Sequence, residues 1–334
     1  MPYENVIIVG AGASAGHSSS SLCPPLGKNL AQTLRREISE FKTIEESTQV
    51  CNEDFEAWMG NPIISANPNH YTDILIYISK FFSKFNSISD DSEYLKLIDE
   101  LGSDCLKNSA FVSLNYEVLL ELALRKRRYV LDFGFVAARD IFNSVESENK
   151  LLVLKPNGSC NYRPQLKFSS FDNKQIVTIG SIVIVPPPKR LAVFDSSSQV
   201  DTGHTDICDP VSLKERDFII PSIVAAYTPT KQANLNSPTI KTIRCEMYKI
   251  MGKPFPKKIV LIGVRYKPND SFFNLIGDAI VGGSKLAIVA PASTYAKYIA
   301  VYEGFKTQIE HVSDQFEGSS KKIKKWITPL SQLK

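Results

Sequence analysis

Close pairs of cysteines are missing from this 334-residue sequence. Its six cysteines are scattered along the chain, and no two of them form a Cys-x-x-Cys pair. A structural zinc site built from four thiolates normally uses such pairs, so the sequence predicts no metal centre. We expect the cysteines to be reduced thiols of a cytoplasmic protein, packed mostly in its core.

Long apolar runs and a strong charge imbalance are missing as well. No apolar run approaches the roughly 18 residues that a membrane helix requires. The segment Val6 to Val9 is too short for the core of a signal peptide and has no basic residues before it. The net charge is +4, from 39 basic and 35 acidic residues, which does not indicate nucleic acid. We therefore expect no membrane association.

What the sequence does contain is an alternation of strand-like and helical segments. Short apolar runs typical of buried parallel strands occupy 5–9, 110–113, 129–133, 151–154, 218–226, 258–263 and 285–289. Helical patterns occupy 28–41, 53–59, 70–85, 94–101, 118–122, 239–251, 270–281 and 294–304, with a terminal helix expected within 313–334. This alternation predicts an α/β fold, a Rossmann-like doubly wound parallel sheet with helical additions.

The middle of the chain has a different pattern. Residues 176–185 alternate and are rich in β-branched side chains, Pro186 to Pro188 interrupt them, and 195–209 are rich in Ser, Thr and Asp. We predict a small β-rich insertion at 160–215, within a single domain that spans 1–334.

The glycine-rich segment Gly10-Ala11-Gly12-Ala13-Ser14 follows the first predicted strand directly and leads toward a helix. Glycine there lets the backbone approach a pyrophosphate, and exposed N–H groups meet the phosphate charge. We therefore predict that these five residues bind a nucleotide. The alternative is a tight strand-to-helix turn that holds no ligand.

Three further segments follow predicted strands, at the edge where open α/β sheets place their ligands. Asn115 is either a ligand-binding residue or an ordinary helix N-cap. Asn157 and Gly158 form a turn signal. Gly263 and Arg265 follow a buried strand, where the guanidinium either meets a phosphate or lies on the surface.

The order of these motifs resembles the sirtuin superfamily, and more specifically the sirtuin-like domains of bacterial anti-phage defence systems. The residues that carry the resemblance span nearly the whole chain: Gly10 to Ser14 with Pro24 to Gly27, Ser113 to Glu117 with Leu119 and Glu121, Lys155 to Ser159, Pro221 and Pro229, Ile262 to Asp270, and Ile288 to Pro291. The resemblance implies an NAD-binding domain with a smaller inserted module, and self-association into a homo-oligomer.

Two branches of the superfamily differ in their chemistry. Deacylases carry a four-cysteine zinc module, whose paired cysteines this chain lacks. The defence-type relatives cleave the bond between nicotinamide and ribose of NAD. In them an asparagine positions the ribose and water, and a nearby histidine assists proton transfer. The resemblance thus implies an NADase, or NAD glycohydrolase, with Asn115 in the position of that asparagine.

Several positions depart from the family's pattern. Asn157 stands where the family's Lys-Leu-His-Gly-Ser segment has its histidine, and a carboxamide is no general base at neutral pH. Arg265 replaces a phosphate-side serine, and the asparagine that meets the adenosine ribose is replaced around Ala290. His17, in the glycine-loop region, is an alternative proton-transfer group. Asn115, Asn157 and His17 are therefore the candidate catalytic residues.

Three hypotheses follow. The first is an NAD glycohydrolase that acts in anti-phage defence. The second is a sensor that binds NAD or ADP-ribose and has lost catalysis. The third is a scaffold that assembles with a separate defence-system protein such as an ATPase. Asn157 favours the second and third, whereas the resemblance along the whole chain favours the first.

Overall fold

The computed structural model describes the core of the chain and several isolated strands. The described residues are 3–16, 23–38, 41, 55, 68–135, 139–140, 150–164, 166–171, 174–179, 182–184, 205–207, 238–268 and 270–328. The strand expected at 218–226 and, apart from Phe55, the short helix expected at 53–59 lie outside these residues.

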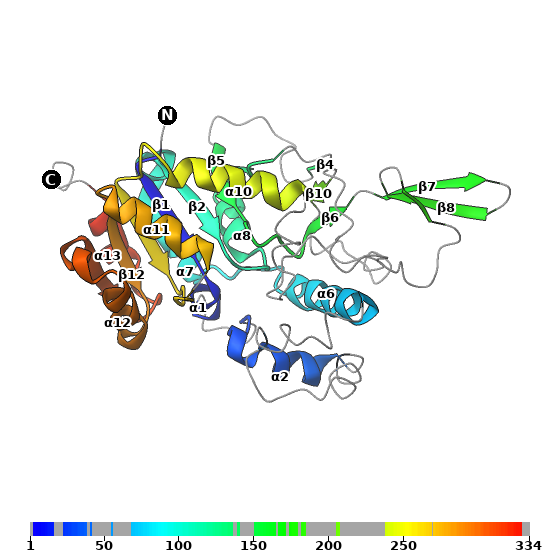
Figure 1. Ribbon diagram of the computed structural model, residues 1–334, viewed down its shortest axis with the longest axis horizontal. Helices are drawn as coiled ribbons and strands as arrows, with labels where there is room; N and C mark the ends of the chain where they lie inside the picture. The colour runs from blue at the N-terminus through cyan, green and yellow to red at the C-terminus, as the bar shows by residue number, and fades with distance from the viewer. Residues whose placement is uncertain are drawn as a thin grey trace.

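A seven-stranded, all-parallel sheet forms the centre of the molecule (Figure 1). From one edge to the other, its strands are β13 (Ile309–Ser313), β12 (Lys285–Val289), β11 (Lys258–Ile262), β1 (Asn5–Val9), β2 (Ser109–Ser113), β5 (Lys150–Leu154) and β3 (Val130–Asp132). The chain builds outward from β1 through β2 on one side and through β11 on the other. The predicted Rossmann-like, doubly wound α/β fold is confirmed.

The central strands are buried along their whole length, and their middle residues are apolar, because both faces of the sheet are covered. Every residue of β1 and of β2 is buried. In the middle of the sheet Ile7 pairs with Val260 on one side and with Phe111 on the other. In a strand that is buried on both faces, no side chain points to solvent, so apolar and polar residues do not alternate. Such a strand appears in the sequence as a nearly continuous apolar run.

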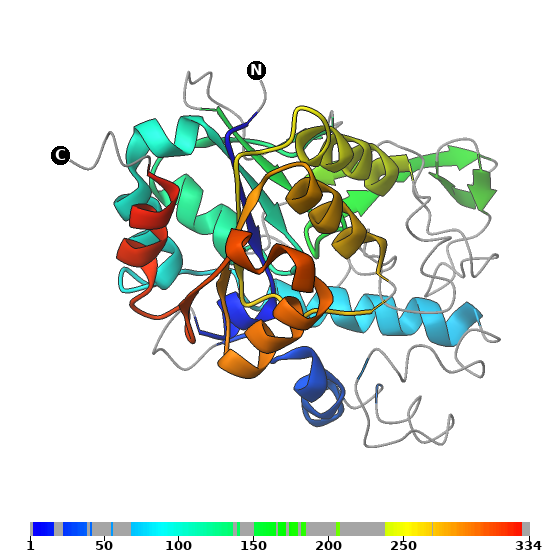
Figure 2. The ribbon, with the colours of Figure 1, turned by 60° about the vertical axis from the view of Figure 1, so that its left-hand side comes forward.

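Helices form a layer on each face of the sheet (Figures 1 and 2). One layer holds α10 (Pro238–Met251), α11 (Ser271–Val281), α12 (Ala292–Val301) and the 3₁₀ helix η3 (Glu303–Gln308). The opposite layer holds α7 (Glu93–Lys107), α8 (Leu119–Lys126) and α13 (Ser320–Ile327). Among the described helices, none has the length and apolar character needed to cross a membrane.

Three more helices lie at the carboxyl end of the strands, and these are α1 (Ala11–Ala15), α2 (Gly27–Glu37) and α6 (Pro68–Ser83). In Figure 1, α1 continues from the end of β1, and α2 and α6 lie beyond it. The ring of Phe82 in α6 meets the ring of Tyr116 edge-on, at 5.5 Å between centroids. Since Tyr116 follows β2, helix α6 packs against the loop that leaves this strand.

Two small three-stranded sheets contain the remaining strands. One joins β4 (Arg139–Asp140), β10 (Thr205–Ile207) and β6 (Tyr162–Pro164), and the other joins β7 (Leu166–Phe171), β8 (Lys174–Ile179) and β9 (Ile182–Ile184). All of these except β4 lie within the 160–215 range expected to be rich in strands. The single run expected at 176–185 is instead two antiparallel strands, because Ile179 pairs with Ile182.

The carboxyl-terminal part departs most from the sequence prediction. Strand β13 was not predicted, and the terminal helix α13 begins only at Ser320. The sequence of β13 includes Glu310, His311 and Ser313, and only Ile309 is buried. An edge strand pairs on one side only and tolerates such polar residues, so it lacks the apolar run that reveals a central strand.

Candidate functional site

The site lies where the strand order reverses, between β1 and β11. Open α/β sheets bind ligands in the crevice outside the carboxyl ends of the strands at this point. Gly10 follows β1, Asn115 follows β2 two residues after its end, and Gly263 follows β11. The fold therefore brings three of the sequence-predicted positions to one edge of the sheet.

The glycines of the predicted nucleotide loop pack against another backbone. A Cβ added to Gly10 would lie 2.8 Å from the carbonyl oxygen of Gly263, and one added to Gly12 would lie 2.8 Å from the Cα of Gly263. Gly263 itself has φ of 62°, and a Cβ there would lie 2.0 Å from the nitrogen of Ala13. The contact between the two turns thus requires glycine at all three positions, whether or not a ligand binds.

The amide groups of this turn are mostly used within the protein. Gly10 donates its N–H to the carbonyl of Ile262 at 2.9 Å, and Gly12 donates to the carbonyl of Gly263 at 3.0 Å. Ala13 donates to the carbonyl of Gly10 at 2.9 Å. The exposed residue of the turn is Ala11, at the start of α1. A phosphate would therefore meet Ala11 and not a ring of free amides.

Asn115 is buried and bonded to the glycine turn. Its Nδ2 donates to the carbonyl oxygen of Gly10 at 3.1 Å and to Ser14 Oγ at 2.8 Å. Helix α8 begins at Leu119, whose N–H is accepted by Glu117 Oε2 at 2.6 Å. The carboxylate of Glu117 thus accepts the hydrogen bond at the start of the helix, and the N-cap residue is Val118. The interpretation of Asn115 as an ordinary N-cap is wrong.

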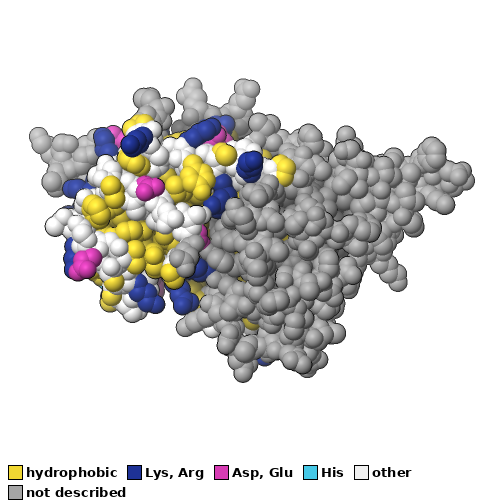
Figure 3. All heavy atoms as spheres, in the orientation of Figure 1, with side chains coloured by type: hydrophobic (Ala, Val, Ile, Leu, Met, Phe, Trp, Pro, Cys, Tyr) yellow, Lys and Arg dark blue, Asp and Glu magenta, His cyan; other side chains and the backbone are white. Residues whose placement is uncertain are grey.

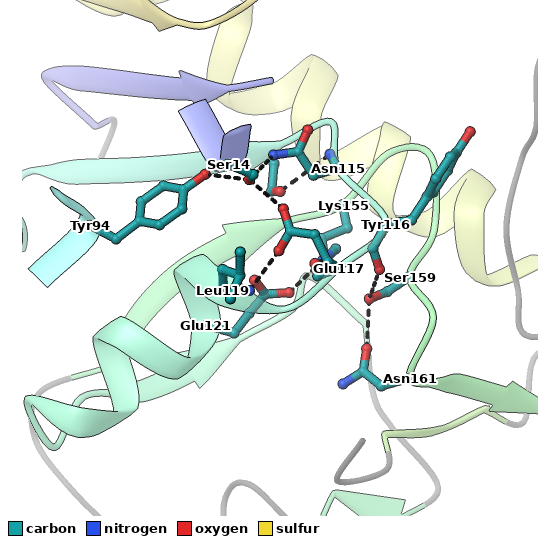
Figure 4. Close-up of polar contacts among 11 residues, drawn as sticks. Ser14, Tyr94, Asn115, Tyr116, Glu117, Leu119, Glu121, Lys155, Ser159 and Asn161 are labelled. Carbon is teal, nitrogen blue, oxygen red and sulfur yellow. Dashed lines mark hydrogen bonds and ion pairs between the residues drawn. The ribbon is translucent and has the colours of Figure 1, made fainter. Parts of the chain in front are cut away.

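Ser14 is the centre of a buried hydrogen-bond network (Figure 4). Its hydroxyl lies 2.5 Å from Glu117 Oε1, to which it donates, and 2.8 Å from the hydroxyl of Tyr94. Because Ser14 has one proton and gives it to the carboxylate, Tyr94 is the donor in the second contact. Burial, and then the charge of Glu117, raise the pKa of Tyr94 well above its usual value, which keeps this donor protonated.

Neither Tyr94 nor Glu117 was identified as a site residue from the sequence. Tyr94 lies on α7, 80 residues after Ser14, and nothing in the chain marks that contact. Glu117 belongs to the sequence motif around Asn115. Its position two residues after Asn115, in the loop after a predicted strand, is the available signal.

A buried ion pair lies next to the network and contacts it through the backbone of Glu117. Lys155 and Glu121 are fully buried, and the Lys155 ammonium lies 2.6 Å from Glu121 Oε1. The ammonium also donates to the backbone carbonyl of Glu117. No described donor reaches Glu121 Oε2. The pKa of Glu121 is raised, mainly by burial. The positive charge of Lys155 lowers this pKa in part, and the negative charge of Glu117 raises it further.

The turn after β5 is attached to the loop after β2. Asn157 Nδ2 donates to the carbonyl of Leu114 at 3.2 Å, and Ser159 Oγ donates to the carbonyl of Tyr116 at 3.2 Å. Gly158 has φ of 76° and closes the turn with a hydrogen bond to the carbonyl of Lys155. The predicted turn is present, and it places Asn157 beside the loop that carries Asn115.

The other predicted site residues are not part of this network. Arg265 is exposed and follows the β11 turn, whereas His17 lies outside the described residues. Across the described part of the chain, no three His, Cys, Asp or Glu side chains are grouped so that they could hold a metal ion. The described cysteines are free thiols, and burial raises the pKa of Cys160 to about 12.

No protein-family model matches the sequence of this chain, and no curated protein matches it either.

Proposed function

We propose that the edge of the sheet around Asn115 binds NAD and that Asn115 orients the ribose and a water molecule for hydrolysis. The supporting observation is the fixed orientation of this side chain. Its Nδ2 is held by Gly10 and Ser14, and no described donor bonds to its Oδ1. In Figure 4 this oxygen points away from the network. An oxygen held in this way is preorganised to accept a hydrogen bond from a hydroxyl or from water.

The pyrophosphate of NAD would contact few groups of the glycine turn. The amides of Gly12 and Ala13 already donate within the protein. The exposed backbone at Ala11 and the exposed guanidinium of Arg265, on neighbouring turns, are the groups proposed to meet the phosphates. This binding mode relies on side-chain charge more than on a cradle of backbone amides.

The proposed reaction requires a single proton transfer. Water adds to C1′ of the ribose while the bond from C1′ to the nicotinamide nitrogen breaks and its electron pair stays on that nitrogen. Because the ring is a pyridinium in oxidised NAD, nicotinamide leaves neutral and takes up no proton. The proton lost by water passes to a base or to solvent. The buried Glu117 carboxylate, bonded to Ser14 behind Asn115, favours the positive charge that develops on the ribose.

A second candidate is binding without hydrolysis. Asn157 uses its amide to hold the carbonyl of Leu114 and, as a carboxamide, accepts no proton near neutral pH. In this case the protein senses NAD or ADP-ribose and passes the signal to a separate protein, such as a defence-system ATPase. For both candidate functions we also propose that the chain self-associates into a homo-oligomer.

The test uses the purified full chain, alone and together with proteins encoded beside it. Nicotinamide release and NAD loss are measured by chromatography, and binding of NAD and of ADP-ribose is measured by calorimetry. Release of nicotinamide in step with NAD loss supports hydrolysis, and binding without release supports the sensor. If the folded protein binds neither ligand at millimolar concentration, both candidates fail.

A further inference from the structure

A cavity of about 270 Å³ that is wide open to solvent lies at the surface, between α11 and the turn from α12 into η3. Three aromatic residues line it, Tyr266, Phe273 and Tyr302, together with two exposed polar residues of α11, Asn274 and Asp278. Figure 3 shows that hydrophobic side chains gather on this face, over α11 and α12, with isolated acidic groups among them and Lys and Arg side chains around the edge. None of the lining residues belongs to the network around Asn115.

The aromatic walls are held in place by their own contacts. The hydroxyl of Tyr302 donates to the carbonyl of Phe273 at 2.8 Å, so the polar end of this side chain is used inside the protein. The rings of Tyr266 and Phe273 lie 4.9 Å apart, tilted by 57°. The ring of Tyr266 also meets that of Tyr298 edge-on at 5.7 Å. The cavity is therefore preformed by rings that support one another.

Gly277 keeps the cavity open. It lies inside helix α11, where glycine costs about 1 kcal/mol relative to alanine. A methyl group at this position would come 3.3 Å from Cε1 of Tyr302, so it would take up space between two residues that line the cavity. The helix thus carries an unfavourable residue at the place where a side chain would reduce the cavity.

The charge of the lining has one sign. Asp278 contributes a carboxylate, and none of the described residues that line the cavity is Lys or Arg. Aromatic faces and a carboxylate both attract a cation, and both repel an anion. We propose that this cavity binds a small organic cation of the quaternary ammonium type, with its methyl groups against the rings and its charge near Asp278. The proposal is independent of the NAD site.

The test uses tetramethylammonium as the probe and the full chain labelled at its valine methyl groups. Val301 lines the cavity, whereas Val281 is exposed on the same helix layer and does not line it. We expect saturable shifts of the Val301 methyl signals, assigned with Val301→Ile, and none for Val281. Neopentyl alcohol, which is neutral and of similar shape, should bind at least tenfold more weakly.

Two variants test the charge and the space separately. Asp278→Asn should weaken tetramethylammonium binding about tenfold, while the control Asp104→Asn, at an exposed position on α7, leaves it unchanged. Gly277→Ala should weaken binding, because the added methyl group lies 3.3 Å from Cε1 of Tyr302 and takes up space beside the aromatic walls. The proposal is overturned if Val301 does not respond, if neopentyl alcohol binds as tightly, or if Asp278→Asn binds like the unmodified protein.

Discussion

Ser14 and Asn115 lie 101 residues apart in the sequence and share a hydrogen bond of 2.8 Å from Asn115 Nδ2 to Ser14 Oγ. The bond joins the turn after β1 to the loop after β2, which are neighbouring strands of the sheet, and β1 borders the point where the strand order reverses. Ser14 is buried and also bonds to Glu117 and Tyr94. In the structure Ser14 therefore fixes the orientation of the Asn115 amide. The sequence alone predicts that Ser14 contacts a nucleotide.

The first prediction concerns Asn115. Asn115→Ala should abolish nicotinamide release, because it removes the group proposed to orient ribose and water. It should lower the free energy of unfolding by about 1–3 kcal/mol, since two buried hydrogen bonds are lost, one to the carbonyl of Gly10 and one to Ser14 Oγ. Activity and urea unfolding are measured together. The control is Asn108→Ala, at an exposed asparagine whose amide also donates to a carbonyl. Full activity of Asn115→Ala would refute the proposed role.

The second prediction concerns Asn157. Asn157→His should raise the turnover about 10²-fold, the lower end of what general base catalysis supplies. The imidazole can donate Nδ1–H to the carbonyl of Leu114, as the amide does, and leave Nε2 free to take the water proton. The gain should therefore increase as pH rises through about 6.5.

Asn157→Ala is the matched control, because it removes the hydrogen bond and supplies no base. It should not raise the turnover. If Asn157→His is slower than the unmodified protein, Asn157 has a positioning role and His17 becomes the next candidate base. If all variants bind NAD equally and none releases nicotinamide, the sensor hypothesis is favoured.

The parts of the fold that the sequence predicts are those where burial alone determines the pattern. β1 and β11 are covered on both faces, so their apolar runs identify them. The sequence predicts a helix over 94–101, whereas α7 continues past a non-helical residue, Gly102, to Lys107. Strand β13 was missed because it is a partly exposed edge strand.

The candidate site was only partly predictable for a related reason. Asn115 and the glycines could be found because each follows a recognisable strand. The partners of Ser14 could not, since the contact with Tyr94 depends on how α7 packs on the sheet. Lys155 belongs to a recognisable turn motif, but its burial against Glu121 comes from the pairing of β5 with β2. Such long-range contacts leave no periodicity in a single sequence.

The third prediction concerns the packing of the two turns. Gly263→Ala should lower the free energy of unfolding by about 3 kcal/mol or more, because φ is 62° and the new Cβ would lie 2.0 Å from the nitrogen of Ala13. Gly304→Ala, where a Cβ meets nothing within 4 Å, should change it by about 1 kcal/mol or less. Urea unfolding measures both. Equal effects would show that the close approach of the turns does not determine stability.

The fourth prediction concerns the buried pair of Lys155 and Glu121. Lys155→Met should cost about 3–5 kcal/mol of unfolding free energy, because it leaves the Glu121 carboxylate buried without its partner. Lys155→Met combined with Glu121→Leu should cost less than Lys155→Met alone, since no uncompensated charge remains. Additive losses in this double-mutant cycle would mean that the two side chains do not depend on each other.

The same pair predicts a dependence on pH. Burial raises the pKa of Glu121 in the folded protein, so the folded state holds this proton more tightly than the unfolded chain does. The stability that this group contributes is complete below its unfolded pKa of about 4.3 and is lost as pH rises through the folded pKa. Glu121→Gln removes this contribution. The difference in unfolding free energy, unmodified protein minus Glu121→Gln, should therefore grow as the pH is lowered from 7 toward 4. A difference that shrinks on acidification would mean that the attraction of Lys155 outweighs burial and lowers the pKa of Glu121.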